Sequence, residues 1–305
     1  MPQSEWPLMD VSRLAYLTGD EPGIGGAIKR RPEDFLVDEV PAYAPCGEGE
    51  HLYLTIEKRR RLTTDVIRLL SRHFGVPRES IGYAGLKDKQ AITRQVFSIH
   101  TKKDDLAATF DDQAIRILGV SRHQNKIRRG HLRGNRFVIK VREVEVAEVL
   151  RVRRMLERLA DQGVPNFLGE QRFGYRMNNH LLGRLLLLGD DQGFLDRMLG
   201  HPIEDESEHA RRARQAYEDG DYATAIEAWP TVHRFERQAV GPLSRGAPAK
   251  DAVNGIDLNQ RQLLISAFQS AIFNHLLDQR LRDGLFGKLL DGDVAFIHAS
   301  RGVFL

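Results

Sequence analysis

The stretch Gly85-Leu-Lys-Asp-Lys-Gln-Ala-Ile-Thr-Arg-Gln95 places one acid between two lysines, just before a strand predicted to start near Gln95. A glycine turn presents Asp88, and loops at strand edges are where catalytic groups tend to lie. The neighbouring ammonium groups of Lys87 and Lys89 favour an ionised carboxylate, which is the form that a carboxylate nucleophile needs. The alternative is a polar loop in which Asp88 only caps a turn.

Alternation of apolar and polar residues predicts strands in the first half of the chain. The expected strands cover residues 35–40, 51–57, 95–100, 114–122 and 136–142. The last of these has one apolar and one cationic face. One helix interrupts the strands: we expect Thr63 or Thr64 as its N-cap, and Gly75 with Pro77 at its end.

The hydrophobic spacing becomes helical from Val146 onward, which predicts a helix-rich second half. Helical patterns cover residues 149–159, 178–188, 192–199, 206–218 and 259–282, and a short strand is expected at 294–298. The stretch 241–255 is rich in Pro and Gly and is expected to be a loop. We therefore predict two domains, residues 1–160 and residues 161–305.

The composition is that of a folded protein, because 41% hydrophobic residues are enough for a sizeable core. The single cysteine, Cys46, excludes an internal disulfide and a zinc site of several cysteines, and it fits a reducing compartment. Residues 1–20 do not resemble a signal peptide, and no apolar run is long enough to span a membrane. We expect a cytoplasmic chain with no membrane partner.

Basic residues are concentrated in two segments although the net charge is only +3. Between Ser121 and Arg142 there are eight Lys or Arg, two His and no Asp or Glu, and the run Lys58–Arg61 is a second cluster. Such patches attract a polyanion such as RNA, whereas the alternative is a solvated face. Arg128, Arg129 and Arg133 are therefore candidate contacts to an RNA backbone.

Five segments, in order along the chain, resemble the motifs of the TruD family of tRNA pseudouridine synthases. The stretch Gly85–Gln95 is similar to the family signature Gly-Leu-Lys-Asp-Lys-x-Ala-x-Thr-x-Gln. The other segments are Gly26-Ala-Ile-Lys-Arg-Arg-Pro-Glu-Asp-Phe-Leu-Val-Asp-Glu39, Gly134-Asn-Arg-Phe137, Pro165-Asn-Phe-Leu-Gly-Glu-Gln-Arg-Phe-Gly174, and Ser266-Ala-Phe-Gln-Ser-Ala-Ile-Phe-Asn274 with Arg280. Their common order carries the resemblance.

The resemblance implies an α+β fold, in which a mixed-sheet pseudouridine synthase domain carries an inserted, mainly helical TruD domain. Residues 1–160 would form the catalytic domain and residues 161–305 the TruD-specific insert. The family continues with a final strand that returns to the catalytic sheet. Because this chain ends at Arg301-Gly-Val-Phe-Leu305, we expect that strand to be missing from it.

The resemblance also implies roles for individual residues. Asp88 would be the nucleophile that converts a tRNA uridine, uridine 13 of the D arm in this family, to pseudouridine. Phe35 and Asn135 would contact the uridine, Phe137 would stack on it, and Lys29 is the basic position expected to pair with Asp88. No cofactor or metal is expected, and tRNA is the expected partner, with no obligate protein partner.

The residue pattern is compatible with those roles. Period two places Asn135 and Phe137 on one strand face, where an amide and a flat ring can hold an extruded uracil. Without the resemblance, core packing is the ordinary explanation for Phe137 and for Phe35. Arg172, in the fourth motif, is a further candidate phosphate contact, or a partner in a structural ion pair.

Two other functions are compatible with parts of the sequence. One is a non-catalytic RNA-binding protein on the same fold, in which Asp88 serves only turn geometry. The other is a metal-dependent nuclease that uses Asp34, Asp38 and Glu39. These three acids alternate between the faces of one strand, which is a poor arrangement for a shared metal.

Overall fold

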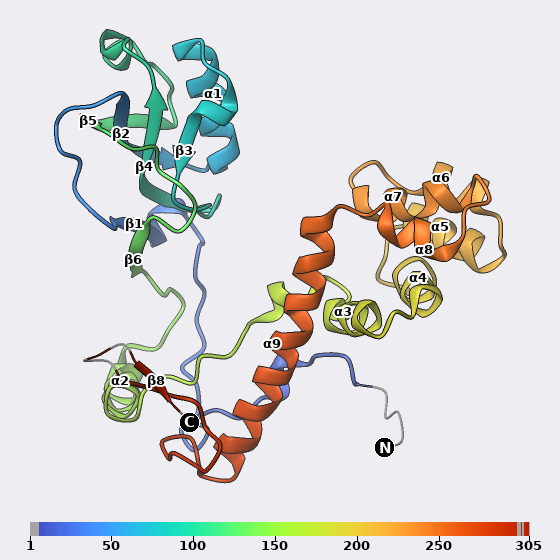
Figure 1. The fold of residues 1–305 in the computed structure, drawn as a ribbon. Coiled ribbons are helices and arrows are strands. Elements are labelled where there is room, and N and C mark those ends of the chain that lie inside the picture. The colour runs from blue at the N-terminus through green and yellow to red at the C-terminus, as the bar shows by residue number, and fades with distance from the viewer. Residues whose placement is uncertain (1–5, 298–299, 301, 305) are drawn as a thin grey trace. The chain divides into compact units, whose positions relative to one another are not determined.

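The computed structural model describes residues 6–297, 300 and 302–304, and it confirms the predicted α+β class (Figure 1). The chain divides into two compact units, which we call the strand-rich unit and the helical unit. The strand-rich unit is Pro22–Arg153, and the helical unit combines Met1–Glu21 with Arg154–Leu305. The catalytic and insert domains assigned to residues 1–160 and 161–305 are functional assignments, and they stay predictions.

The strand-rich unit is built on a mixed sheet (Figure 1). Its strands are β1 (Phe35–Pro41), β2 (His51–Arg59), β3 (Ile81–Tyr83), β4 (Ile92–His100), β5 (Ile115–His123) and β6 (Leu132–Ile139). They lie in the order β5-β2-β4-β1-β6, with β3 paired to β4. Strands β1 and β4 run parallel, and the other pairs among these strands run antiparallel.

Helix α1 (Thr63–Phe74) provides the core of this unit on one side of the sheet. Its Leu70 and Phe74 pack in one buried cluster with Leu54 of β2 and Phe97 of β4. Alternation along β2 and β4 places the residues of this cluster on the same sheet face. The helix ends at Gly75, as predicted, because its φ of 65° is a left-handed conformation that glycine adopts without strain.

The start of α1 differs from the expectation that Thr63 or Thr64 is its N-cap. Leu62 is the N-cap residue, and its backbone N donates a hydrogen bond to the carboxylate of Asp65 at 3.4 Å. Thr63 is the first helical residue and is buried. Its hydroxyl bonds to Gln95 and to the Asp88 loop, so it does not cap the helix.

Strand β6 starts and ends earlier than the predicted 136–142. It covers Leu132–Ile139, and Arg142 beyond it pairs through its backbone with Ala27. Its apolar side chains are exposed, including 52% of Phe137 and 44% of Ile139. The reason is position: β6 is the edge strand next to β1, whereas the α1 core lies on β2, β4 and β5.

The helical unit contains most of the helices. They are α3 (Asn179–Leu188), α4 (Asp191–Leu199), α5 (Glu208–Glu218), α6 (Tyr222–Ala228), α7 (Arg234–Leu243), α8 (Ala249–Asn254) and α9 (Leu258–Arg282), while α2 (Val149–Gln162) spans the boundary between the units. Strand β7 (Ala295–Ile297) pairs with β8 (Gly302–Phe304). His298, the end of the strand expected at 294–298, lies outside the described residues.

The prediction of a loop over residues 241–255 was wrong. Helix α7 extends to Leu243 with Pro242 in its last turn, and α8 follows after Pro248, its N-cap. Ala252 and Val253 of α8 are buried in the core of the unit. Proline and glycine mark helix ends as well as loops, so their frequency alone does not separate the two.

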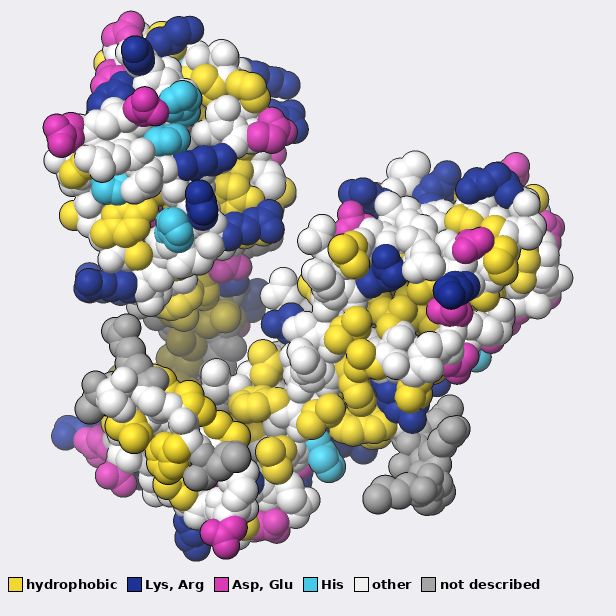
Figure 2. Space-filling view, in the orientation of Figure 1, with side chains coloured by type: hydrophobic (Ala, Val, Ile, Leu, Met, Phe, Trp, Pro, Cys, Tyr) yellow, Lys and Arg dark blue, Asp and Glu magenta, His cyan; other side chains and the backbone are white. Residues whose placement is uncertain are grey.

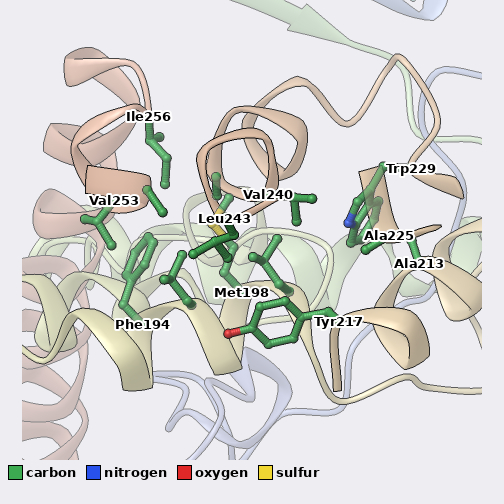
Figure 3. Close-up of a cluster of buried hydrophobic side chains, with 14 of the residues drawn as sticks. Phe194, Met198, Ala213, Tyr217, Ala225, Trp229, Val240, Leu243, Val253 and Ile256 are labelled. Carbon is green, nitrogen blue, oxygen red and sulfur yellow. The ribbon is translucent and has the colours of Figure 1, made fainter. Parts of the chain in front are cut away.

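The helical unit has its own hydrophobic core (Figure 3). Phe194, Met198, Tyr217, Trp229 and Val240 come from α4 to α7 and the turn after α6, and they pack in one buried cluster. Among the described residues no helix combines the length and apolar character that crossing a membrane requires.

Two of the sequence motifs meet in this unit. Asn274 in α9 is fully buried, and its side-chain amide accepts a hydrogen bond from the backbone N of Leu168 at 2.9 Å. The same amide donates to the backbone O of Leu168 at 2.8 Å. These bonds join the segments 165–174 and 266–280, so Asn274 serves the structure of the unit.

Gly183 allows α3 and α9 to cross closely, because a Cβ at this position would collide with the backbone carbonyl of Leu264. We expect Gly183→Ala to destabilise the protein by about 2–3 kcal/mol, since backbone on both helices has to move. Gly241→Ala in α7 is the matched control, because its Cβ would meet only ordinary contacts. Pro242 follows this position and disfavours a helical backbone at a residue with a Cβ, which offsets the gain in helix propensity, so we expect a change within about 1 kcal/mol. Urea unfolding measures both, and equal effects would contradict the close crossing.

Candidate active site

Asp88 lies in the loop between β3 and β4, and the backbone of this loop is pinned from inside the protein. The side chain of Gln95 donates a hydrogen bond to the backbone O of Gly85 at 3.1 Å. The backbone N of Lys87 donates to the hydroxyl of Thr63 at 3.0 Å, and that hydroxyl donates to Gln95 at 3.1 Å. Gln95 and Thr63 are both buried. The last residue of the signature stretch thus holds its first.

Lys58 is a fully buried lysine that donates to the backbone O of Asp88 at 2.7 Å. It occupies the inward face of β2, in step with Leu54 and Ile56, which are also fully buried. Burial lowers the pKa of the Lys58 ammonium to about 8, against the opposing effect of the nearby Asp88 charge. In the sequence, Lys58 is the first residue of the basic run Lys58–Arg61. Its parity with Leu54 and Ile56 was the signal that it points inward.

The carboxylate of Asp88 is 46% exposed and forms an ion pair with Lys29, whose Nζ lies 3.0 Å from Asp88 Oδ1. The same Nζ lies 4.1 Å from the ring centroid of Phe35. Lys29 has a φ of 59°, which is uncommon for a residue with a Cβ. Backbone strain of this kind tends to occur at functional sites.

The lysines that flank Asp88 in the sequence do not form its ion pair, contrary to the expectation above. Lys87 Nζ pairs with Glu39 Oε2 at 2.6 Å, and both side chains are buried. Lys89 is exposed. The cations at Asp88 are Lys29 and Lys58, which come from distant segments of the chain. Neighbours in a loop point in different directions, so adjacency did not identify the partner.

Phe137 is an exposed aromatic residue on the same sheet face as Phe35 and Glu39. Asn135 and Phe137 of β6 share one face, opposite Glu39 and Val37 of β1 respectively. The rings of Phe35 and Phe137 are 5.9 Å apart at 68°, an edge-to-face arrangement. Phe35 is only 7% exposed, so Phe137 offers the open ring face.

The candidate RNA contacts Arg128 and Arg129 are exposed in the turn between β5 and β6. This turn is bound to the start of the Asp88 loop, because the backbone N of Gly130 donates to the backbone O of Ala84 at 2.8 Å. Arg129 also donates to the hydroxyl of Tyr83 at 3.2 Å. Figure 2 shows several Lys and Arg side chains on the surface of the strand-rich unit.

The other two candidate arginines lie in different units. Arg133 is exposed on β6 and lies at the register shift between Gly134 and Leu132, where strand alternation does not assign a face. Arg172 belongs to the helical unit, in the 3-10 helix Glu170–Phe173. Arg133 therefore belongs to the same unit as Asp88, and Arg172 belongs to the other unit.

The three acids of the nuclease alternative each have their own cation. The pairs are Asp34 with Arg142 at 2.7 Å, Asp38 with Arg94 at 3.5 Å and Glu39 with Lys87 at 2.6 Å. Hydrogen bonds from Arg142 lower the pKa of the Asp34 carboxyl. In the described part of the chain no group of three or more His, Cys, Asp or Glu is arranged to hold a metal ion. Each of the three acids is thus paired with a cation from a different segment of the chain.

The fold and the site define a class of protein. A mixed sheet presents a carboxylate on a pinned loop, an open aromatic ring and a basic surface, as an enzyme that modifies a base in RNA requires. The family model TruD, described as tRNA pseudouridine synthase D, matches residues 11–304. The chain belongs to the TruD family.

Individual relatives show the same likeness. The tRNA pseudouridine synthase D of Geobacter sulfurreducens is 43% identical over 291 residues, which are 95% of this chain and 71% of the relative. That of Geotalea daltonii is 40% identical over 291 residues, 95% of this chain and 73% of the relative. The crystal structure of the putative tRNA pseudouridine synthase D (TruD) from Methanosarcina mazei has a TM-score of 0.80 at 28% identity, covering 95% of this chain and 68% of that one.

Because of Lys58, we expect the free energy of unfolding to change with pH in the alkaline range. Its folded-state pKa of about 8 is below the roughly 10.4 of an unfolded lysine, so the unfolded chain binds more protons between these values. The free energy of unfolding therefore gains up to about 3 kcal/mol from this group as pH rises from about 8 to about 10.4. We expect Lys58→Met to lose this rise and the exposed Lys89→Met to keep it. Urea unfolding at successive pH values measures the slopes, and parallel curves for wild type and Lys58→Met would exclude a depressed pKa.

Proposed function

We propose that this protein isomerises a uridine of tRNA, uridine 13 in the D arm, to pseudouridine, with the Asp88 carboxylate as nucleophile. The observation that carries the proposal is the half-exposed carboxylate, held by Lys29 at 3.0 Å on a loop whose backbone is pinned. Membership of the TruD family supports the reaction and the substrate class. A cytoplasmic location, where tRNA is found, is part of the same proposal.

The proposed reaction rearranges bonds without net oxidation. The bond between N1 and C1′ breaks, the base turns, and C5 bonds to C1′. The proton that leaves C5 is balanced by the proton that N1 gains, so no cofactor is needed. Attack by Asp88 at C1′ or at C6 needs an ionised carboxylate, and the Lys29 Nζ lies 3.0 Å from the Asp88 carboxylate. The pinned backbone positions the carboxylate before substrate binds.

The uridine has to leave its stack to reach Asp88, and β6 supplies groups that would hold it. Phe137 has an open ring face on which a uracil can stack. Asn135 lies on the same face and has an amide that can bind the edge of the base. Phe35 is mostly buried, so its role would be to support Phe137 and Lys29 from behind.

The alternative is a non-catalytic RNA-binding protein in which Asp88 only shapes the turn. A turn-capping acid accepts hydrogen bonds from backbone N–H groups of its own loop. Within the described residues the Asp88 carboxylate accepts a hydrogen bond from Lys29 and none from that backbone. This arrangement supports the enzyme.

Asp88→Asn tests the nucleophile. We expect pseudouridine formation to be abolished, because an amide cannot attack, while tRNA affinity stays within a few-fold. Mass spectrometry of the tRNA measures the product, and filter binding measures the affinity. Asp105→Asn, an exposed acid elsewhere in the unit, is the control and should keep full activity. Product from Asp88→Asn would exclude Asp88 as nucleophile, and no product from wild type would favour the binding protein.

Reversing two charges tests the proposed RNA surface. We expect Arg128→Glu with Arg129→Glu to weaken tRNA binding. The slope of log affinity against log salt concentration should decrease by the amount that roughly two phosphate contacts contribute. Binding measured over a series of salt concentrations gives both quantities. Arg72→Glu with Arg116→Glu, two exposed arginines on α1 and β5, is the matched control for net charge. The same slope in both double variants would place the RNA elsewhere.

A further inference from the structure

Five arginines line an open hollow on the strand-rich unit, with a volume of about 560 Å³. They are Arg30, Arg31, Arg59, Arg60 and Arg142, and Pro32 and Glu33 complete the lining. We call this hollow the arginine basin. The candidate RNA contacts discussed above, Arg128, Arg129 and Arg133, are not part of its lining.

The basin carries positive charge that its own acids do not neutralise. Three of its arginines are paired: Arg59 with Glu33, Arg30 with Glu143 at 2.9 Å, and Arg142 with Asp34 at 2.7 Å. The exposed side chains of Arg31 and Arg60 form no ion pair among the described residues, although the backbone N of Arg31 donates to the Asp34 carboxylate at 3.0 Å. Two guanidinium groups therefore remain for an anion, while the paired ones hold the shape of the basin.

The arginine basin adjoins the Asp88 site through the chain itself. Lys29, which binds the Asp88 carboxylate, directly precedes Arg30 and Arg31. Lys58, which binds the Asp88 carbonyl, directly precedes Arg59 and Arg60. Two residues span at most about 7 Å, which is close to the length of one nucleotide.

The backbone at Arg60 is fixed in an unusual conformation. Its φ of 53° is left-handed, and its backbone N donates to the backbone O of Ala91 at 3.2 Å. Ala91 follows the Asp88 loop and is fully buried. The side chain of Arg60 thus leaves from a backbone that is bound directly to the end of that loop.

We propose that the arginine basin binds a backbone phosphate of the RNA beside the uridine on which Asp88 acts. A planar guanidinium group can donate to two phosphate oxygens at once. Arg31 and Arg60 supply the two guanidinium groups of the basin that form no ion pair. A nucleotide that leaves its stack keeps its phosphates outside the base pocket. A phosphate held here would offset part of the cost of unstacking. The inference rests on the proposed function and specifies how the same site positions its substrate.

The double variant Arg31→Gln with Arg60→Asn removes both unpaired charges. Asparagine suits position 60 because it tolerates a left-handed φ. We expect about tenfold weaker tRNA binding. The slope of log affinity against log salt concentration should decrease by the contribution of roughly two phosphate contacts. Arg72→Gln with Arg116→Gln is the control of equal charge. Unchanged affinity and slope in the basin variant would overturn the proposal. This measurement uses the full chain and does not depend on turnover.

Uncharged methylphosphonates locate the phosphate. A tRNA carrying one on either side of the target uridine should bind wild type several-fold more weakly at one of the two positions. The same replacement should cost the basin variant less than twofold, because its partner is already gone. Equal losses in both proteins would overturn the proposal. Inorganic phosphate that binds wild type, but not the variant, with tRNA binding unchanged would assign the basin to a free anion.

The two proposals fail in different ways. Pseudouridine formation by wild type on unmodified tRNA is scored separately from binding. If wild type makes no pseudouridine, the proposed function fails, and the salt series still shows whether the basin binds RNA. If wild type makes pseudouridine and the basin variant matches it in affinity, slope and rate, only the basin is refuted.

Discussion

The hydrogen bond from the buried Lys58 ammonium to the backbone carbonyl of Asp88 is the interaction on which the rest of the site depends. A buried ammonium needs a partner, and the carbonyl supplies one, with the Asp88 charge nearby. This hydrogen bond fixes the loop backbone from the protein interior. The Asp88 carboxylate stays at the surface beside Lys29. One residue is both fixed in place and open to a substrate, which is what a nucleophile needs.

Buried charge in this sheet is arranged in separate pairs. Glu39 and Lys87 neutralise each other in the interior, and Asp34 is matched by Arg142. Lys29, in contrast, pairs with the half-exposed Asp88. Removing one partner of either buried pair would leave an uncompensated charge, which is costly in the interior.

The sequence was most informative where the physical signal is periodic. Alternation located the long strands and placed Asn135 and Phe137 on one face, because period two is a property of every strand. It failed where one residue type has two uses. Thr63 resembles an N-cap yet binds the Asp88 loop, and Lys87 lies beside Asp88 in sequence yet binds a different acid. Only the motif resemblance connected Lys29 with Asp88, because no local pattern spans that separation.

Strand β2 serves the Asp88 loop through Lys58 and the arginine basin through Arg59 and Arg60, which directly follows the strand. The number of residues in this strand therefore matters for both. Lys58 points inward and Arg59 outward, because successive residues of a strand alternate. An insertion or deletion of one residue there would exchange the two sides, moving an interior cation to the surface and a surface cation to the interior. A frame change in β2 would therefore remove support from the Asp88 loop and from the arginine basin together.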